Sequence, residues 1–386
     1  MRRCTQPAFG TVVSLLLCLL FSAFQTSSMV FAATFVYVAN EGGDIATLQL
    51  DPQNGDLKLL GKTQSGPLTM HLAVSPDKKF LYASVRQAPF QLVSFAIDPQ
   101  TGALTEKGRI ASPANMTYIS TDRTGKFLFG ADYPNGRVAV LAIGSDGLLV
   151  EKPVQVFETS LHAHSILPSP NNKFVFVPHL GSARISAFRF DEQTGKLTFN
   201  GTPFYYVKQT SGPRHQAYHP NGRWWYLTSE LDGLVYVHTF DEQTGIINEI
   251  QMIRALPDDS PLVNSPSPGG AAPSTTAPAS GIRQADIHIT PNGRFLYTSE
   301  RTSSTIAAFS IDQETGRLKY IANYPTEPTP RGFNIDPSGK YLIAAGEVKD
   351  GYIRVHAINP QSGELTDLRR YSVGDRPNWV MCVEFD

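Results

Sequence analysis

The stretch TPNGRFLY at residues 290–297 decides the fold of this chain, because the chain repeats its pattern five more times. A proline fixes the backbone at the second position of a turn, and Gly or Asn accepts the left-handed position that follows. The aromatic and aliphatic run after the turn is typical of a β-strand, so each copy predicts a turn that leads into a strand. The other copies are SPDKKFLY at 75–82, DRTGKFLF at 122–129, SPNNKFVF at 169–176, HPNGRWWY at 219–226 and DPSGKYLI at 336–343.

A second pattern, Asp-x-x-x-Gly-x-Leu, alternates with the first and marks a polar turn between strand-like segments. Strands without helices, at a repeat of about 47 residues, have the spacing of propeller blades. Helical solenoids share this repeat but need apolar residues at a spacing of about 3.6, which this chain lacks. Full or near-full copies lie at 51–57, 98–104, 191–197, 241–247, 312–318 and 359–365, with a degenerate copy at 144–148. The seven copies predict an all-β protein, a seven-bladed β-propeller.

The two ends of the repeat array predict how the ring closes. FVYVAN at 35–40 matches the second strand of a blade whose first strand is missing. WVMCVEF at 379–385 is a strand that no further blade follows. We therefore expect the C-terminal strand to complete the first blade, which leaves no open seam between the first and last blades.

The repeat spacing has one exception, since Pro220 and Pro291 are 71 residues apart. The surplus maps to residues 257–281, a stretch rich in Pro, Ser, Ala and Gly that cannot bury much apolar area. It is interpreted as a flexible loop inserted in one blade, and residues 33–386 are expected to form a single propeller domain.

The first 32 residues have the features of a secretory signal peptide. Arg2 and Arg3 form a basic start, an apolar run covers 12–24, and small residues precede position 33. The alternative, an uncleaved membrane anchor, is disfavoured because this run is shorter than the ~20 residues that a spanning helix needs. The mature protein is expected to be secreted to the periplasm, with Cys382 as its one cysteine and therefore no internal disulfide.

The net charge of the mature chain bears on which classes of macromolecule it binds. Removal of residues 1–32 lowers Lys+Arg from 33 to 31 against 34 acidic residues, so the mature net charge is −3. This balance favours neither nucleic acid nor an anionic membrane as a partner. The sequence also has no Gly-rich phosphate loop, no Cys/His zinc spacing and no Gly-x-Ser-x-Gly elbow, so no cofactor and no metal are expected. A closed propeller is expected to be a monomer.

Alignment of the repeats on their turns identifies two rings of candidate functional residues. Six positions before the turn proline the repeats have Met70, Thr117, His164, Arg214, Ala285 and Arg331. Ten positions after it they have Arg86, Tyr133, Leu180, Glu230, Arg301 and Glu347. Equivalent positions of a propeller surround its axis, so the charged members should converge at one mouth of the channel. Buried charges are costly unless they are paired or hydrated, and this cluster is compatible either with an anion-binding pocket or with a structural ion-pair network that plugs the channel.

Several motifs resemble the propeller lactonase family, which includes bacterial 6-phosphogluconolactonases and fungal carboxy-muconate lactonising enzymes. They are GPRH at 212–215 ahead of HPNG at 219–222, SEL at 229–231, HAH at 162–164 ahead of SP at 169–170, and TPRGF at 329–333 ahead of DPSG at 336–339. The likeness covers essentially all of residues 34–386.

The resemblance implies hydrolysis of a small-molecule substrate, a sugar-acid lactone. The catalytic residues that it implies are His164, Arg214, Glu230 and Arg301. In this interpretation the arginines hold an anionic group and the developing oxyanion, and Glu230 or His164 takes a proton from water. Further substrate contacts are expected from Arg331, Glu347, His179 and Arg86. His179 departs from the family, in which an acidic residue is usual at this position.

Other functions stay open at this point. A muconate-type cycloisomerase would use the same residues with a proton donor in place of the base. An exported propeller can also be a non-catalytic binding protein or cell-surface scaffold, although such a protein has no reason to place His, Arg, Glu and Arg in adjacent blades. Phosphogluconolactone is a cytosolic metabolite, which leaves a different lactone open for an exported relative.

Overall fold

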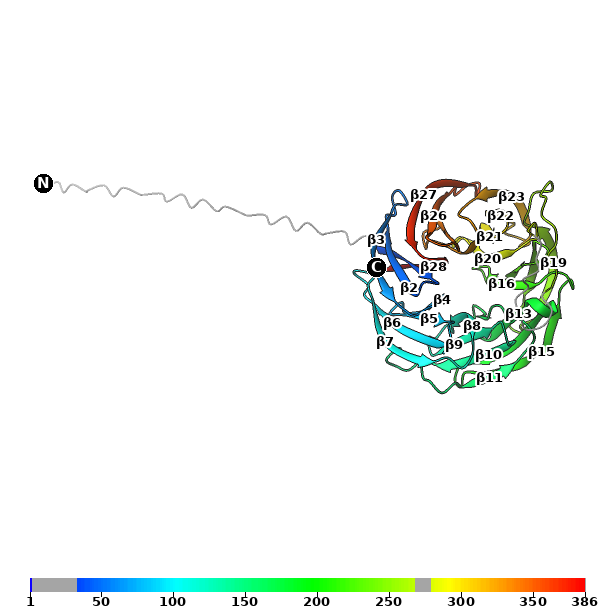
Figure 1. Cartoon of the computed structure of the whole chain (residues 1–386), viewed down its shortest axis with the longest axis horizontal. Helices are drawn as coiled ribbons and strands as arrows, with labels where there is room; N and C mark the ends of the chain where they lie inside the picture. Colours follow the sequence, from blue (N-terminus) through cyan, green and yellow to red (C-terminus); the bar gives the residue numbers. More distant parts are fainter. Residues whose placement is uncertain (2–32, 268–278, 386) are drawn as a thin grey trace. The chain divides into compact units, whose positions relative to one another are not determined.

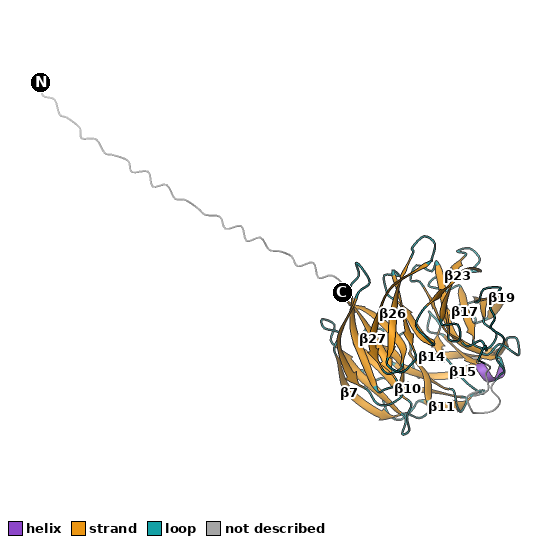
Figure 2. Cartoon of the chain, turned by 45° about the horizontal axis from the view of Figure 1, so that its top comes forward, coloured by secondary structure: helices purple, strands orange, loops and turns teal. Residues whose placement is uncertain are grey.

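The computed structural model describes Met1, residues 33–267 and residues 279–385. Residues 2–32 of the predicted signal peptide and the central part of the predicted insert lie outside the described residues. In the unit Ala32–Phe385 the described strands form seven four-stranded sheets. The sheets follow one another around a ring (Figure 1), and strands account for nearly all of the regular structure (Figure 2). The prediction of an all-β seven-bladed propeller is confirmed.

Each blade is a sheet whose four strands run from the channel to the outer edge. Blade 1 has β28 (Pro377–Phe385), β1 (Ala33–Asn40), β2 (Asp44–Leu50) and β3 (Leu57–Gln64). Blade 2 has β4 (Thr69–Val74), β5 (Phe80–Val85), β6 (Gln91–Ile97) and β7 (Leu104–Ala111). Blade 3 has β8 (Met116–Thr121), β9 (Phe127–Asp132), β10 (Arg137–Ala142) and β11 (Gln155–Glu158). Blade 4 has β12 (Leu167–Pro168), β13 (Phe174–His179), β14 (Arg184–Asp191) and β15 (Lys196–Tyr206), with a 3-10 turn at Leu180–Ser182.

The remaining three blades have the same plan. Blade 5 has β16 (Pro213–Tyr218), β17 (Trp224–Ser229), β18 (Leu234–Phe240) and β19 (Ile247–Arg254). Blade 6 has β20 (Gln284–Ile289), β21 (Phe295–Glu300), β22 (Thr305–Ile311) and β23 (Leu318–Pro325). Blade 7 has β24 (Pro330–Ile335), β25 (Tyr341–Gly346), β26 (Gly351–Ile358) and β27 (Leu365–Gly374). In the described part of the chain, no helix has the length and apolar character that crossing a membrane requires.

The C-terminal strand closes the ring as the sequence predicts. β28 pairs antiparallel with β1, and the register runs from Ala33 opposite Phe385 to Asn40 opposite Pro377. The rings of Phe35 and Phe385 pack with their centroids 5.9 Å apart. The first blade therefore contains both ends of the propeller, and neither edge of the seam is left unpaired.

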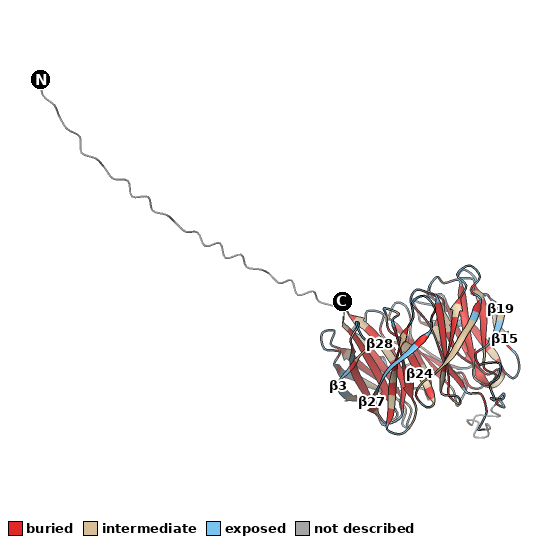
Figure 3. Cartoon of the chain, turned by 90° about the horizontal axis from the view of Figure 1, so that it is seen from above, coloured by how far each residue is buried: buried red, intermediate tan, exposed pale blue. Residues whose placement is uncertain are grey.

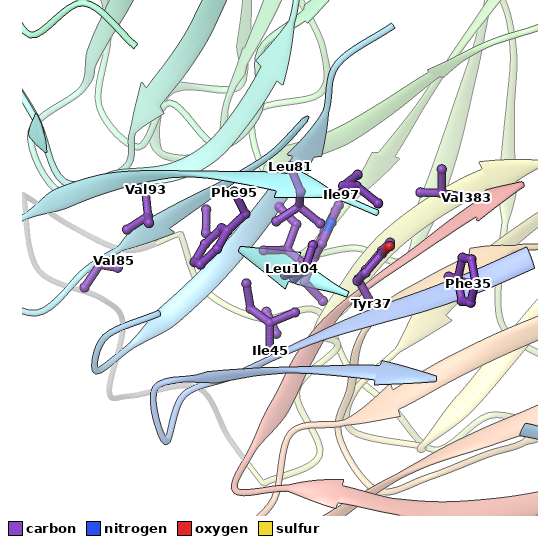
Figure 4. Packing of buried hydrophobic residues seen from close by; sticks show 14 of the residues in the cluster. Phe35, Tyr37, Ile45, Leu81, Val85, Val93, Phe95, Ile97, Leu104 and Val383 are labelled. Atoms are coloured by element: carbon purple, nitrogen blue, oxygen red, sulfur yellow. The ribbon is translucent and has the colours of Figure 1, made fainter. Parts of the chain in front are cut away.

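One apolar cluster lies between each pair of neighbouring blades, and the described residues contain seven such clusters. Figure 4 shows the cluster between blades 1 and 2, which contains Phe35 and Tyr37 of β1 and Leu81 of β5. Alternate side chains of a strand point to opposite faces, so β5 directs Leu81 towards blade 1 and Tyr82 towards blade 3. Both faces of the second strands are buried, whereas the outer strand β27 is largely exposed (Figure 3). This burial explains why the repeat continues as an unbroken apolar run, in which each large side chain contributes about 1.5–3 kcal/mol.

The two repeated turn patterns contact each other across neighbouring blades: the aromatic residue after one turn packs against the glycine of the other. Trp224 begins β17 and lies against Gly316 in the polar turn of blade 6, where a Cβ atom would lie 2.4 Å from the indole ring. Gly316 also has a φ of +73°, which disfavours any other residue. The hydroxyl of Tyr226 donates a hydrogen bond of 2.9 Å to the Gly316 carbonyl. The glycines that pack in the same way in the other blades are Gly55, Gly102, Gly147, Gly195, Gly245 and Gly363.

The predicted insert lies in a different place from the one expected. Residues 257–281 connect β19, the outer strand of blade 5, with β20, the inner strand of blade 6, so the insert is not within one blade. Its described ends are attached to the propeller: Val263 and Gly281 form a parallel bridge, and the Ser265 amide donates to the Leu231 carbonyl over 2.8 Å. A connection between blades must return from the rim to the channel, and that path brings the ends of the insert to the mouth.

Candidate active site

β-Bulges in the inner strands place side chains at the mouth of the channel. The pairing of β16 with β17 shifts between Pro213 and Gln216, so Arg214 and His215 lie in the irregular part of the strand. A bulge releases residues from the ladder and changes the direction of their side chains. The pairing shifts at the corresponding place in five further blades, in β4, β8, β20, β24 and the junction of β28 with β1. Each of these blades therefore has one or two inner-strand residues outside the hydrogen-bonded ladder, and they surround the axis.

The bulged residues form two layers along the channel. The upper layer lines a cavity of about 790 Å³ and contains Met70, Thr117, His164, Arg214 and Arg331. The lower layer consists of the residues that follow in the bulges, together with a tryptophan of β28. These residues contact one another by ring packing or hydrogen bonds, and they are His71, Tyr118, His215, Asp286 and Trp379.

Glu230 is at the centre of the charged side of the cavity. Its Oε2 lies 2.7 Å from Arg214 Nε, and its Oε1 lies 2.7 Å from Arg301 Nη2. Oε2 also lies 3.9 Å from Nε2 of His164. Burial alone would raise the pKa of the Glu230 carboxyl, but the guanidinium groups of Arg301 and Arg214 outweigh it and lower the pKa to about 2. The four residues implied to be catalytic thus meet in one place, and Glu230 is a permanent anion there.

Arg214 is held from below by the lower layer. Its Nη1 donates to the Ala285 carbonyl over 2.7 Å and lies 3.1 Å from Nε2 of His215. Nδ1 of His215 lies 2.8 Å from Oδ1 of Asp286. A guanidinium has no acceptor, so Nε2 of His215 must accept, and Nδ1 must carry the proton that Asp286 accepts. Burial, with the Arg214 charge, lowers the pKa of His215 to about 4, which keeps this imidazole neutral at pH 7.

His164 lies above this layer in an irregular segment, and not in a regular strand as expected. The inner strand of blade 4 is only two residues long, and the neighbouring β13 contains Pro178, which has no N–H to donate. The His164 amide instead donates to the Pro178 carbonyl over 3.0 Å. The imidazole packs edge-on against Tyr133 at 5.1 Å. Burial, followed by the charge of Arg214, lowers the pKa of His164 well below its ordinary value, so this side chain is neutral at pH 7.

Two further arginines complete the cavity. Arg331 Nη1 lies 3.1 Å from Oε1 of Glu347, and Arg86 Nε donates to Oδ1 of Asn115 over 2.7 Å. Both arginines line the cavity, whereas Glu347, also expected to contact the substrate, pairs with Arg331 and does not line the cavity. In the described ranges, no group of three His, Cys, Asp or Glu side chains is arranged to hold a metal ion.

His179 is outside the cavity. Its Nδ1 lies 3.1 Å from the Ser160 carbonyl, and its Nε2 lies 2.9 Å from the Ser186 hydroxyl. The side chain is fully buried, and burial lowers its pKa to about 3. His179 precedes Leu180, which does line the cavity. Neighbouring residues at the end of a strand point to opposite faces, so the expected contact between His179 and the substrate does not fit its position.

Comparison with known proteins identifies the family. The family model described as "Lactonase, 7-bladed beta-propeller" matches residues 30–384. The chain belongs to this lactonase family. The match spans all seven blades and both strands of the seam, so the whole propeller is the unit that the family shares.

Curated relatives and solved structures agree with this assignment. The lactonase is 39% identical to a 6-phosphogluconolactonase of Serratia proteamaculans, over 90% of this chain and 98% of the relative. It is 40% identical to a 6-phosphogluconolactonase of Erwinia tasmaniensis, over 91% of this chain and 99% of the relative. A periplasmic gluconolactonase of Pseudomonas aeruginosa superposes with a TM-score of 0.80 at 26% identity, over 91% and 99% of the two chains.

Two charged cavity residues of this lactonase were missed by the sequence analysis. Glu41 lies six residues after Phe35, the same spacing that separates Trp224 from Glu230. It is the blade 1 member of that ring, and it was missed because the alignment was anchored on a turn proline that blade 1 lacks. Burial, together with Glu347, raises the pKa of Glu41. Arg283 lies just before β20, and no repeated pattern marks it.

Proposed function

We propose that this lactonase opens the ring ester of a sugar-acid lactone of the 6-phosphogluconolactone type in the cavity around Glu230. The observation that carries the proposal is the contact of Glu230 with Arg214, Arg301 and His164 beside an open volume of about 790 Å³. A cavity of this size holds a small polar molecule. An ion-pair network that only plugged the channel would leave no such space.

The space between Glu230 and His164 suits the attacking water. Oε2 and Nε2 are 3.9 Å apart, which is too long for a direct hydrogen bond but allows one water molecule to contact both atoms. Glu230 accepts the proton as the water oxygen bonds to the lactone carbonyl carbon. Neutral His164 holds the water in line. Binding of an anionic lactone offsets the arginine charges that depress the Glu230 pKa, so the carboxylate becomes a better base when substrate is present.

Arg214 and Arg301 stabilise the negative charge that the carbonyl oxygen develops. Arg214 uses Nε and Nη1 for protein contacts, and Arg301 donates through Nε to the Arg283 carbonyl over 3.1 Å. Nη2 of Arg214 and Nη1 of Arg301 make no hydrogen bond to a described residue. Preorganised donors of this kind supply much of the rate of acyl transfer. Collapse of the intermediate breaks the bond to the ring oxygen, which takes the proton from Glu230 and gives the open hydroxy acid.

The export of the protein is a further part of the proposal. The basic start and apolar run of residues 1–32 support cleavage and a periplasmic location, and a ring that is closed by the pairing of β28 with β1 supports a monomer. N-terminal sequencing of the protein from the periplasmic fraction and sedimentation of the purified protein test these two points. An intact N-terminus in the cytoplasmic fraction, or a stable dimer, would contradict them.

The activity is tested by measuring acid release from glucono-δ-lactone and its 6-phosphate with purified protein. We expect hydrolysis well above the spontaneous rate on at least one lactone. Glu230→Gln should lower kcat/KM by about a hundredfold or more, because the base is lost. Glu314→Gln, in an exposed polar turn of blade 6, is the control that should leave the rate unchanged. A wild-type rate equal to the spontaneous rate on both lactones would refute the proposal.

A further inference from the structure

The cavity has more positive than negative charge. Its lining includes five arginines but only two glutamates, Glu41 and Glu230. Glu347 behind Arg331 adds a third carboxyl. The arginines therefore outnumber the acids by two, and the surplus of charge favours an anionic ligand.

Arg283 differs from the other four arginines of the cavity because no group in residues 33–267 or 279–385 binds its guanidinium. Arg86 donates to Asn115, Arg331 pairs with Glu347, and Arg214 and Arg301 share Glu230. Among the described residues, Arg283 has neither a side-chain hydrogen bond nor an ion pair, and it is exposed to solvent. The nearby charge of Arg301, with partial burial, lowers the pKa of Arg283, as expected for two cations that no carboxylate separates.

The backbone of Arg283 is fixed although its head group is free. Its amide donates to Oε1 of Glu300 over 2.7 Å, and its carbonyl accepts from the Arg301 amide and from Arg301 Nε, both over 3.1 Å. The two preceding residues are also tied, since Ser265 donates to the Ile282 carbonyl and Thr302 donates to the Gly281 carbonyl. A cation on a rigid base loses little conformational entropy when it binds a ligand. Such an arrangement is typical of a binding group.

The position of Arg283 relative to Glu230 defines what it reaches. Arg301 contacts both residues: its Nη2 lies 2.7 Å from Glu230, and its Nε binds the Arg283 carbonyl. Arg283 is therefore connected through Arg301 to Glu230, the proposed base, and both residues line the cavity. In a six-carbon δ-lactone, the substituent on C6 is separated from the ester carbon by the ring oxygen, C5 and C6.

We infer that the guanidinium of Arg283 forms a subsite for an anionic group that the lactone carries at C6. This inference rests on the proposed function and specifies the substrate class, a lactone with a phosphate or a carboxylate at that carbon. A guanidinium binds either group through paired hydrogen bonds. The described ends of the insert, at Ser265 and Ala279, also line the cavity.

The test compares three lactones in wild type and in Arg283→Gln. The lactones are glucono-δ-lactone 6-phosphate, a glucaric acid lactone with a carboxylate at C6, and neutral glucono-δ-lactone. We expect the ratio of kcat/KM for the preferred anionic lactone to that for the neutral lactone to fall about ten- to a hundredfold in the variant, the effect of one charge-assisted contact. Whichever anionic lactone has the larger ratio in wild type identifies the group. Arg294→Gln, an exposed arginine of the same blade outside the cavity, should leave the ratio unchanged.

The possible failures are distinguishable. An unchanged ratio in Arg283→Gln, or an equal loss on all three lactones, would overturn the subsite and leave the lactonase activity intact. If wild type hydrolyses none of them, the proposed function fails. The subsite is then tested by calorimetric binding of 6-phosphogluconate, which should weaken at least tenfold in Arg283→Gln and not in Arg294→Gln. Equal binding by wild type and Arg283→Gln would overturn it.

Discussion

The two sides of the channel mouth use the same backbone for different purposes. On blades 2 and 3 the bulged upper-layer residues are Met70 and Thr117, and on blade 5 the equivalent residue is Arg214. All three positions result from a shift of the inner strand against the second strand. The comparison shows that the fold needs the bulge but not a particular side chain in it. Chemistry is therefore free to be concentrated on one side, where blades 4 to 6 supply His164 and Glu230.

The lower layer shows the same division. On the side of blades 1 to 3, the ring of His71 lies between Tyr118 and Trp379, with centroids 3.9 Å and 3.7 Å away. On the side of blades 5 and 6, His215 instead hydrogen-bonds to Asp286 and accepts from Arg214. The first arrangement is a packed aromatic floor, and the second is a polar support for Arg214, the cation that we propose stabilises the oxyanion. The following predictions test this division from the largest effect to the smallest.

Substitution of the upper-layer bulge residue should lower activity in blade 5, at Arg214, but not in blade 2, at Met70. Arg214→Met gives blade 5 the residue that blade 2 has, and it should lower kcat/KM for the preferred lactone by about a hundredfold to a thousandfold, the usual cost of a lost oxyanion donor. Met70→Leu should remain within about threefold of wild type. Thermal unfolding should be recorded for both variants, because Arg214→Met also removes a partner of buried Glu230. Equal losses in the two variants would show that the two sides do not differ.

Removal of the support below Arg214 should have a smaller effect. Asp286→Asn weakens the bond that fixes the His215 tautomer, so Arg214 loses a defined acceptor at Nη1. We expect kcat to fall about tenfold and the free energy of unfolding to fall by about 1–3 kcal/mol, as for a disrupted buried hydrogen bond. Tyr118→Phe, in the aromatic floor, should change kcat less than twofold. A normal kcat with a lowered melting temperature in Asp286→Asn would mean that Asp286 is only structural.

The pH profile of the neutral lactone tests the charge state of the site. The pKa of Glu230 is lowered to about 2, and that of His164 is also lowered, so both groups stay unprotonated as the pH falls from 7.5 to 5. We expect enzymatic kcat/KM, corrected for spontaneous opening in a pH-stat, to change less than about threefold over this range. An ordinary histidine base with a pKa of about 6.5 would instead lose activity about tenfold per pH unit at the acid end. That steep loss would contradict the assignment.

The smallest effect is expected at Thr117. Its hydroxyl is buried and has no hydrogen-bond partner among the described residues, so Thr117→Val removes a polar group that forms no bond. Both kcat/KM and the melting temperature should stay close to wild type, or the melting temperature should rise slightly. A loss of activity above about fivefold would place Thr117 in contact with the substrate and extend the catalytic side into blade 3.

The sequence predicts the fold well because its signals are local and repeated. The turn at residues 290–297 recurs in six blades, and the glycine that packs against Trp224 has a counterpart in every other blade. The upper layer was predictable for the same reason, since Arg214 and Arg331 hold equivalent places in the repeat. Equivalent positions converge on an axis whatever residues occupy them.

The remaining parts of the site depend on contacts that no single repeat contains. The bond between His215 and Asp286 joins two blades, and nothing in either repeat indicates that the residue after the bulge faces the axis as well. His179 was misplaced because a shift of one residue at the end of a strand reverses the direction of the side chain. Arg283 can be assigned to the cavity only from the structure, because it follows the insert and no repeated pattern marks it. The guanidinium of Arg283 is found to lack a partner among the described residues only when all the blades are considered together.

The most direct test of this division of the mouth is a crystal structure of the protein with 6-phosphogluconate, the open product of the phosphorylated lactone. We predict that the C1 carboxylate lies between Arg214 and Arg301 within hydrogen-bond distance of both, and that the C6 phosphate contacts Arg283. Density for the product against Met70 and Thr117, with Arg214 and Arg301 still bound only to Glu230, would contradict the assignment of catalysis to the arginine side.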